Sequence, residues 1–361
     1  MSVRTHRAGT EARVLRAPVS ALAQLHQIVL PTPWDVGPVQ IYLIEGDPVT
    51  LIDTGVKTPE SRAALGAALE SLGLGLDDVQ RVILTHAHGD HLGQAQTLRD
   101  AGADLEVWAH EAEAPMIEFF SVENDERIDE TNELFREYGV PEDLLREQSE
   151  RKRQWMRESP PLCEATRVDR LLRDGEALPF KDFELRVIHA PGHTVGHILL
   201  HEPQSGALVT GDHIMGSAVP FTENGYLDGP PDPRDPLGRR PRFKGLSAYL
   251  TSLRGLRRTS FSTILPAHGG VLERPDRAIE DALLFYEVRI QRIERGLRTL
   301  AAMGKDVTGW EIWKALFPKA DPLTQMRTRM LMVIGALDVL EETGTGVTLR
   351  RDDGVLLHHH R

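Results

Sequence analysis

The chain has 361 residues, of which 40% are hydrophobic and 27% are charged, a composition typical of soluble globular proteins. Its formal net charge of −12 argues against nucleic acid as the main ligand, because phosphate binding needs a concentrated basic surface. The single cysteine, Cys163, excludes an intramolecular disulfide and fits a cytoplasmic location. No stretch is apolar enough for a secretory signal or a membrane span, so no membrane partner is expected.

Apolar runs separated by turn residues predict strands and helices in the first third of the chain. Residues 1–20 are expected to form a loose tail. Antiparallel strands are predicted for HQIVLP, VQIYLIEGD and VTLIDTG, because EGDP between the last two is typical of a turn. A helix is predicted over 59–73, and RVILT predicts a buried strand. Next, a helix is expected from about His91 to Asp100, and LEVWAH predicts another strand.

Residues 111–172 differ from the rest because they carry 17 acidic and 9 basic residues, a net charge of −8. They predict two or three amphipathic helices, interrupted at Gly139-Val140-Pro141. One interpretation is a solvated helical insertion on the surface. The other is a lid above an active site or a contact in a homodimer, and the sequence favours neither.

The remaining segments complete an α/β pattern and then change in character. Strands are predicted for FELRVIHA, HILLHEP and GALVTGD, followed by a Pro/Gly-rich loop, a helix (LSAYLTSLRGLRR) and a last strand, FSTILPAHGG. From residue 277 onward, three helices precede a two-stranded ribbon that turns at Asp353-Gly354. This order is typical of a winged helix. We therefore expect a catalytic domain over 21–276 and a helical linker with a winged-helix-like domain over 277–361.

The stretch THAHGDHLG, residues 85–93, gathers potential metal ligands on a loop that leaves a buried strand. It contains His86, His88, Asp90 and His91, and alternate side chains such as the first two can converge on one point. Imidazole and carboxylate groups are suitable ligands for zinc or a similar metal. Taken alone, the stretch is also compatible with a polar turn.

Three further polar side chains follow later strands and strengthen the metal interpretation. His193 lies in PGHTVGH, Asp212 in TGDH and His268 in PAHGG, each with a glycine close by that lets the backbone approach a crowded site. Imidazole or carboxylate groups that recur at strand ends over some 180 residues are hard to explain by packing. The four stretches together predict one metal centre assembled from distant parts of the chain.

These four motifs resemble the ordered motif set of metallo-β-lactamase-fold hydrolases, and their spacing is most similar to the glyoxalase II-like branch. The resemblance covers roughly residues 25–275. It implies an α/β fold of four layers, the αββα sandwich, here with a helical insertion. The C-terminal helices and ribbon resemble the winged-helix appendage of the β-lactamase-like protein 2 group.

The resemblance also implies a two-metal site whose members can be assigned by motif. His86, His88 and His193 would hold one metal, Asp90, His91 and His268 would hold the other, and Asp212 would bridge them together with a water or hydroxide. Zinc is expected, with iron or manganese as alternatives. The residues expected to take part in catalysis are His86, His88, Asp90 and Asp212. Asp53 and His197 are expected to support the ligands from behind.

The expected reaction is attack of a metal-bridging hydroxide on an ester-like carbonyl, with a thioester of the acyl-CoA, acyl-carrier or glutathione type as substrate. A lactone or a β-lactam is an alternative substrate, because the metal centre is shared among these hydrolases. A metal-dependent ribonuclease that uses the winged helix to bind nucleic acid is a second hypothesis. Residues 285–361 hold 12 Lys and Arg against 10 Asp and Glu, a nearly balanced charge that argues against it.

Overall fold

The computed structural model describes residues 13–16, 24–102 and 104–361, and it divides the chain into two compact units. The first comprises Met1–Glu123, Pro161–Pro220 and Gly255–Glu280, and the second comprises Asn124–Pro160, Phe221–Arg254 and Asp281–Arg361. This division differs from the expected boundary at residue 276. Residues 124–160 and 221–254, which the sequence placed in or beside the catalytic domain, belong to the same unit as the C-terminal part.

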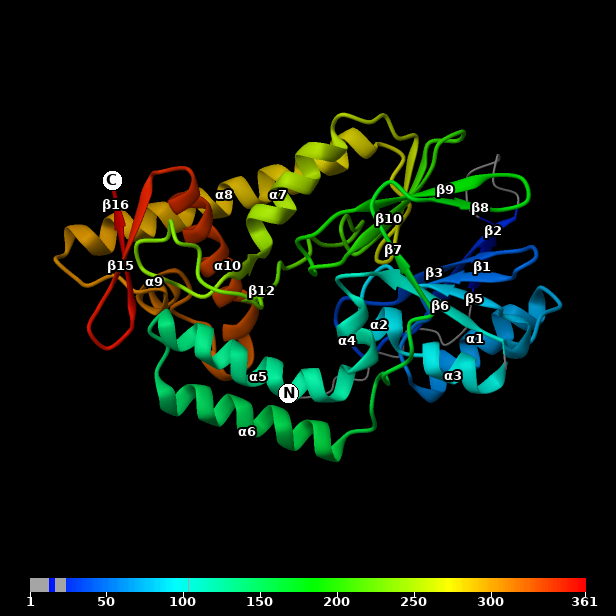
Figure 1. Ribbon diagram of the computed structural model, residues 1–361, viewed down its shortest axis with the longest axis horizontal. Coiled ribbons are helices and arrows are strands. Elements are labelled where there is room, and N and C mark those ends of the chain that lie inside the picture. The colour runs from blue at the N-terminus through cyan, green and yellow to red at the C-terminus, as the bar shows by residue number, and fades with distance from the viewer. Residues whose placement is uncertain (1–12, 17–23, 103) are drawn as a thin grey trace. The chain divides into compact units, whose positions relative to one another are not determined.

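The first unit contains a mixed seven-stranded sheet whose strands follow one another in chain order (Figure 1). Pairing is antiparallel from β1 to β4 and parallel from β4 to β7. The strands are β1 (Arg13–Arg16), β2 (Leu25–Leu30), β3 (Val39–Ile44), β4 (Thr50–Ile52), β5 (Arg81–Ile83), β6 (Glu106–His110) and β7 (Arg170–Leu172). Most of the tail predicted over residues 1–20 lies outside the described residues, but residues 13–16 form β1 instead of a loose segment because they pair with β2.

A second sheet of the same unit has five strands in the order β14-β11-β10-β9-β8. They are β8 (Ala177–Pro179), β9 (Glu184–His189), β10 (Ile198–Glu202), β11 (Ala207–Gly211) and β14 (Thr263–Pro266). Since β10 is antiparallel to both β9 and β11, and β11 is parallel to β14, three strands run in one direction. The carboxyl ends of β9, β11 and β14 therefore meet at one edge of this sheet.

The helices of the first unit are short except for α1 (Pro59–Ser71), which was predicted. The helix expected from His91 to Asp100 is instead two helices, α2 (Gly89–Leu92) and α3 (Ala95–Ala101). They separate at Gln94, whose backbone N–H donates to the Thr54 hydroxyl at 3.0 Å. A short helix α4 (Ala114–Glu118) follows β6.

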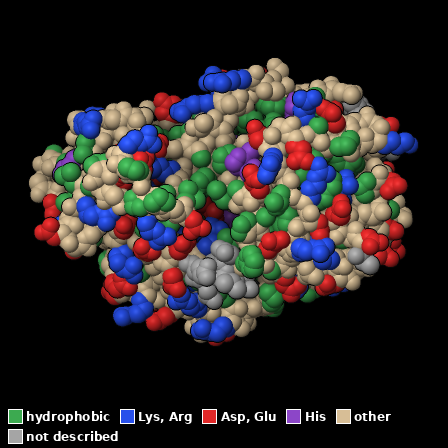
Figure 2. Space-filling view, in the orientation of Figure 1, with side chains coloured by type: hydrophobic (Ala, Val, Ile, Leu, Met, Phe, Trp, Pro, Cys, Tyr) green, Lys and Arg blue, Asp and Glu red, His purple; other side chains and the backbone are tan. Residues whose placement is uncertain are grey.

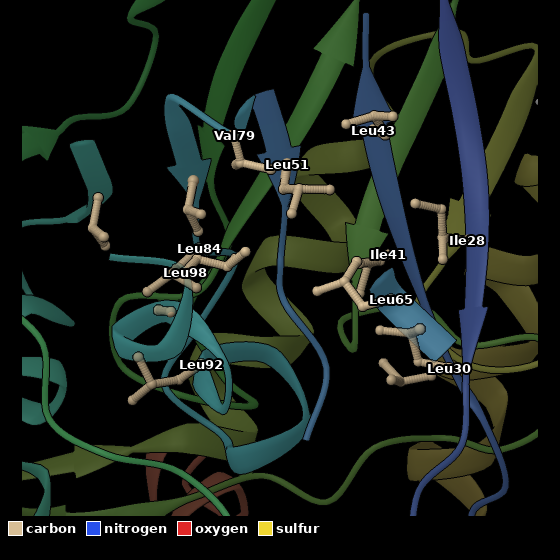
Figure 3. Close-up of a cluster of buried hydrophobic side chains, with 14 of the residues drawn as sticks. Ile28, Leu30, Ile41, Leu43, Leu51, Leu65, Val79, Leu84, Leu92 and Leu98 are labelled. Carbon is tan, nitrogen blue, oxygen red and sulfur yellow. The ribbon is translucent and has the colours of Figure 1, made fainter. Parts of the chain in front are cut away.

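Charged side chains of both signs are interspersed over the face in view (Figure 2), while apolar side chains fill two layers of core. Along the first sheet, successive residues face opposite layers, as the period of a strand requires. Leu43 and Leu51 pack with Leu65 of α1 and other apolar residues (Figure 3). Their neighbours Tyr42 and Ile52 pack against the second sheet. Burial on both faces fixes the sheet between helices and a second sheet, consistent with the predicted sandwich.

The second unit is mostly helical. Helix α5 (Phe120–Glu137) begins in the first unit and is followed by α6 (Glu142–Glu158), so the predicted interruption at residues 139–141 is confirmed. The other elements are β12 (Asn224–Tyr226), β13 (Arg242–Lys244), α7 (Gly245–Leu256), α8 (Pro275–Ala302), α9 (Gly309–Leu316), α10 (Pro322–Glu342), β15 (Gly346–Arg350) and β16 (Leu356–His360). The last residues of α7 and the first residues of α8 belong to the first unit. The order of three helices and a ribbon is as predicted, whereas the winged-helix assignment stays a prediction. Within the described residues, no helix combines the length and apolar character that a membrane crossing requires.

Two helical glycines allow a matched test of packing. A Cβ added at Gly335 of α10 would lie 2.7 Å from Cβ of Leu246, whereas a Cβ at Gly66 of α1 would have no atom within 4 Å. We expect Gly335→Ala to lower the free energy of unfolding by about 1–3 kcal/mol because the contact is overpacked. Gly66→Ala should raise it by roughly 0.5–1 kcal/mol because alanine is the better helix former. Urea unfolding followed by circular dichroism measures both, and a Gly335→Ala protein as stable as Gly66→Ala would contradict this packing.

Candidate metal centre

The candidate centre forms where strands of both sheets end. Asp53 follows β4, and His86 lies three residues beyond the end of the parallel strand β5. In the second sheet, Asp212 follows β11 and His268 lies just beyond β14. Parallel strands place their carboxyl ends at one edge, so residues far apart in the chain become neighbours. All seven residues predicted as ligands fall into two adjacent clusters within the first unit.

The first cluster consists of His86, His88, His193 and Asp212. One potential ligand atom from each of them lies within 4.8 Å of the others. Nε2 of His86 is 3.0 Å from Nδ1 of His88, and the rings of His88 and His193 have centroids 4.6 Å apart. His88 is half-buried and the other three are buried. This spacing leaves room for one small cation among the four groups.

The second cluster consists of Asp90, His91 and His268, and Asp212 faces both clusters. Oδ1 of Asp212 lies 3.5 Å from Nε2 of His91 and 3.5 Å from Nε2 of His268. Its other oxygen, Oδ2, lies 3.5 Å from Nε2 of His193. A single carboxylate thus points one oxygen towards each cluster, the geometry that a bridging ligand needs.

The polar atoms at the centre fit a cation better than they fit one another. Among the residues that the structure describes, Nε2 of His91 and Oδ1 of Asp212 are buried without a hydrogen-bond partner. Leaving such atoms unsatisfied costs free energy comparable to a lost hydrogen bond. A divalent cation between them would satisfy both. With only nitrogen and oxygen donors, the set suits zinc, iron or manganese.

The electrostatics keep His86 and Asp212 in their ligand forms, whereas the pKa values of His91 and His268 are raised against the effect of burial, that of His268 through its hydrogen bond with Asp90. Burial, together with the surrounding imidazoles, lowers the pKa of His86 well below its usual value, so the ring is neutral. Burial alone would raise the pKa of Asp212, but the imidazoles of His91 and His193 hold it well below its usual value. Burial acts to lower the pKa of His91, yet nearby carboxylates, Asp53 foremost, raise it well above its usual value. Cation binding at His91 must therefore release a proton.

Asp53 lies behind the second cluster. Its Oδ1 accepts a hydrogen bond from the Thr85 backbone N–H at 2.8 Å, and its Oδ2 accepts one from the Thr85 hydroxyl at 2.8 Å. The same Oδ2 lies 2.8 Å from Nδ1 of His91. A proton held on Nδ1 leaves Nε2 of that ring free to face the cluster.

His197 lies behind the first cluster and is not one of its potential ligands. Its Nε2 accepts a hydrogen bond from the Asp212 backbone N–H at 3.3 Å, and its ring stacks on His86 with centroids 4.7 Å apart. Burial and the imidazoles of His213 and His193 lower the pKa of His197 well below its usual value, so the ring stays neutral. The supporting role expected of His197 from the sequence stays a prediction.

Glu113 is a buried residue that the sequence analysis missed. Its carboxylate accepts hydrogen bonds from the backbone N–H of Ala87 at 2.9 Å, from that of Gly196 at 2.7 Å and from the Thr194 hydroxyl at 3.1 Å. It stands in the acidic stretch 111–172, where it does not differ in the sequence from the surrounding acidic residues. The available signal was its place just after the strand LEVWAH, comparable to that of Asp53 after β4.

Cys163 lies beside the first motif but is unsuited to act as a nucleophile. A Cβ added at Gly89 would be 3.6 Å from its Sγ. Burial, reinforced by the charges of Asp90 and Glu164, raises the pKa of the thiol to about 12. We expect this thiol to stay unreactive towards an aromatic disulfide reagent at pH 8 in the folded protein, and one thiol per chain to react in denaturant. Rapid reaction of the folded chain would contradict the described burial.

Comparisons with known proteins agree with this geometry. "Probable metallo-hydrolase YqjP" of Bacillus subtilis (strain 168) is 30% identical over 315 residues, which cover 87% of this chain and 91% of that protein. The crystal structure of a metallo-beta-lactamase family protein from Thermus thermophilus superposes with a TM-score of 0.71 at 26% identity, covering 95% of this chain and all of that one. A shorter match, 28% identical over 103 residues, links 28% of this chain to 26% of "Atrochrysone carboxyl ACP thioesterase AgnL7" of Paecilomyces divaricatus. Residues 34–268 match the family model of the metallo-beta-lactamase superfamily, and the chain belongs to that superfamily.

Proposed function

We propose that the chain is a dinuclear metal-dependent hydrolase that cleaves an ester-like bond, with a thioester as its substrate. The observation that carries the proposal is the position of Asp212, whose two oxygens face the two clusters at 3.5 Å from His91 and His193. A carboxylate with this placement would bridge two cations, which the chemistry of a shared, activated water requires.

Each cluster has a distinct task in this proposal. His86, His88 and His193 would hold one cation, Asp90, His91 and His268 would hold the other, and zinc is the proposed metal, with iron or manganese as alternatives. When bound, the two ions supply a water acidic enough to be ionised near neutral pH and polarise the substrate carbonyl.

Asp90 is placed to accept the proton released on attack as well as to serve as a ligand. Its Oδ2 lies 3.1 Å from Nε2 of His268, and its Oδ1 lies 3.6 Å from Nε2 of His91. Burial acts to raise the pKa of Asp90, but the charge of His91 and the hydrogen bond with His268 lower it below its usual value. The carboxylate is therefore ionised at neutral pH, as a ligand must be, and only the oxygen that does not bind the cation would accept the proton.

A thioester is the preferred substrate class, and activated water is the preferred nucleophile. The similarity to a protein described as an acyl-carrier-protein thioesterase points to this chemistry, although it spans only 28% of the chain. In addition, the only thiol is buried and protonated, so the reaction is assigned to activated water and not to a cysteine nucleophile.

The charges of the second unit favour a small molecule over nucleic acid. Arg242 is paired with Asp338, and Lys244 lies 3.0 Å from Glu342. Acidic and basic side chains are also interspersed over the face shown in Figure 2. A surface that grips phosphates needs unpaired basic groups in one area.

The proposal is tested by assaying the zinc-loaded protein with acyl-CoA thioesters, a lactone, a β-lactam and single-stranded RNA. We expect turnover of thioesters and a loss of more than about 100-fold in a His86→Ala/Asp212→Ala double variant, because groups that stabilise the transition state are removed. The bound metal, measured by mass spectrometry, should fall in parallel.

A His359→Ala/Asp352→Ala variant is the matched control, because both residues are exposed in the C-terminal ribbon of the second unit. It should keep full activity and metal content. Metal-dependent cleavage of RNA without thioester turnover would overturn the thioester assignment, and full turnover by the double variant at the centre would overturn the metal mechanism itself.

A further inference from the structure

Two loops that carry ligands of the first cluster meet at Glu113. The loop after β5 contributes the backbone N–H of Ala87, which lies between His86 and His88. The loop between β9 and β10 contributes the Thr194 hydroxyl and the backbone N–H of Gly196, just beyond His193. These loops leave different sheets, and besides Glu113 they are joined by a backbone hydrogen bond from the Ile198 N–H, where β10 begins, to the Thr85 carbonyl at 3.0 Å.

The approach of Gly196 to Glu113 is so close that no larger residue fits. A Cβ added at Gly196 would lie 2.6 Å from the Glu113 backbone nitrogen and 2.8 Å from its Oε2. Real Cβ atoms do not approach other atoms this closely. The chain thus brings the second loop into direct contact with the carboxylate.

The hydrogen bonds of Glu113 with the two loops matter for stability because this residue is buried, with only 2% of its surface exposed. A buried carboxylate is stable only when donors compensate for its lost hydration, and here the donors come from both loops. If either loop moved away, the carboxylate would lose part of that compensation. The loops are therefore held at a fixed separation, and with them His88 and His193, whose rings lie 4.6 Å apart.

Asp53 differs because it contacts a potential ligand directly: its Oδ2 lies 2.8 Å from Nδ1 of His91 in the second cluster. Its other partner, Thr85, has its hydroxyl oxygen 3.1 Å from Nδ1 of His86 in the first cluster. We propose that Glu113 is a positioning residue for the cation held by His86, His88 and His193, and that it has little effect on the cation at the second cluster. This inference rests on the proposed dinuclear function. Glu113 then supports the loops of the first cluster, whereas Asp53 contacts a potential ligand of the second cluster directly.

The test is titration of the metal-stripped protein with zinc in the presence of a chelating indicator. Wild-type protein should bind two equivalents. In Glu113→Gln, an amide nitrogen replaces one carboxylate oxygen and cannot accept the hydrogen bonds that Oε2 accepts now. One zinc equivalent should therefore bind about 10- to 100-fold more weakly, and the affinity for the other should be unchanged. Thr194→Val removes a single hydrogen bond and is the milder second variant, for which the same equivalent should weaken by about five-fold.

Double variants identify which cation is affected. On a His268→Ala background, which impairs the second cluster, Glu113→Gln should weaken the remaining zinc by the same factor. On a His193→Ala background, which impairs the first cluster, Glu113→Gln should weaken the binding of the remaining zinc only slightly.

Glu202→Gln is the matched control for loss of a buried carboxylate. Glu202 is 2% exposed and accepts backbone hydrogen bonds from Gln204 at 2.9 Å and Ser205 at 2.6 Å, in a turn that carries no residue of either cluster. It should lower the melting temperature as Glu113→Gln does, while both zinc affinities stay unchanged.

Four outcomes would overturn the inference. Unchanged zinc binding in both Glu113→Gln and Thr194→Val would remove the positioning role and leave the proposed function intact. Equal weakening of both equivalents, or the same weakening in Glu202→Gln, would indicate general destabilisation instead. Wild-type protein that binds fewer than two equivalents would overturn the dinuclear function and this inference together.

Discussion

The hydrogen bonds of the Asp53 carboxylate are the interaction on which the candidate centre depends most. They join the end of β4 to Thr85 at the end of β5 and to His91 in α2, all at 2.8 Å. To make them, Asp53 adopts a φ of 63°, a left-handed conformation that is unfavourable for most residues other than glycine. Such a conformation persists only when the surrounding structure holds it, and here three hydrogen-bonding groups do so.

From this anchor the charges of the centre become mutually dependent. Burial lowers the pKa of His86, and the neighbouring imidazoles lower it further. Burial also acts to lower the pKa of His91, but the surrounding carboxylates raise it above its usual value. The ring centroids of His86 and His91 are only 4.0 Å apart. The opposite pKa shifts therefore arise from the different groups that each ring faces. Without a cation, the raised pKa keeps a proton on His91, which helps to balance the carboxylates of Asp90 and Asp212; a cation bound there would take over that role.

Much of this arrangement could be predicted from the sequence because its signals are local. Apolar runs mark the strands, and His86, His193, Asp212 and His268 stand at or just beyond strand ends in short motifs. Glu113 is harder to predict from the sequence than these four residues. Two of its three described partners are backbone N–H groups, which any residue except proline provides.

Other features depend on contacts between distant residues and could not be predicted for the same reason. Helices α2 and α3 separate because Gln94 bonds to Thr54, a residue 40 positions earlier in the chain. The grouping of residues 124–160 with the C-terminal part likewise rests on contacts between segments far apart in sequence. The spacing of apolar residues within one segment carries no information about the break between α2 and α3 or about the grouping of residues 124–160.

The close approach of the two sheets explains why glycine appears among the motif residues. Gly211 has a φ of 49°, and a Cβ there would lie 2.7 Å from the Thr85 hydroxyl and 3.0 Å from Nε2 of His197. A larger residue would push the end of β11 away from the end of β5. Asp212, the next residue, would then move out of reach of one cluster or the other. The position of that carboxylate between the two clusters thus depends on the absence of a side chain at Gly211 as much as on the side chains that surround it.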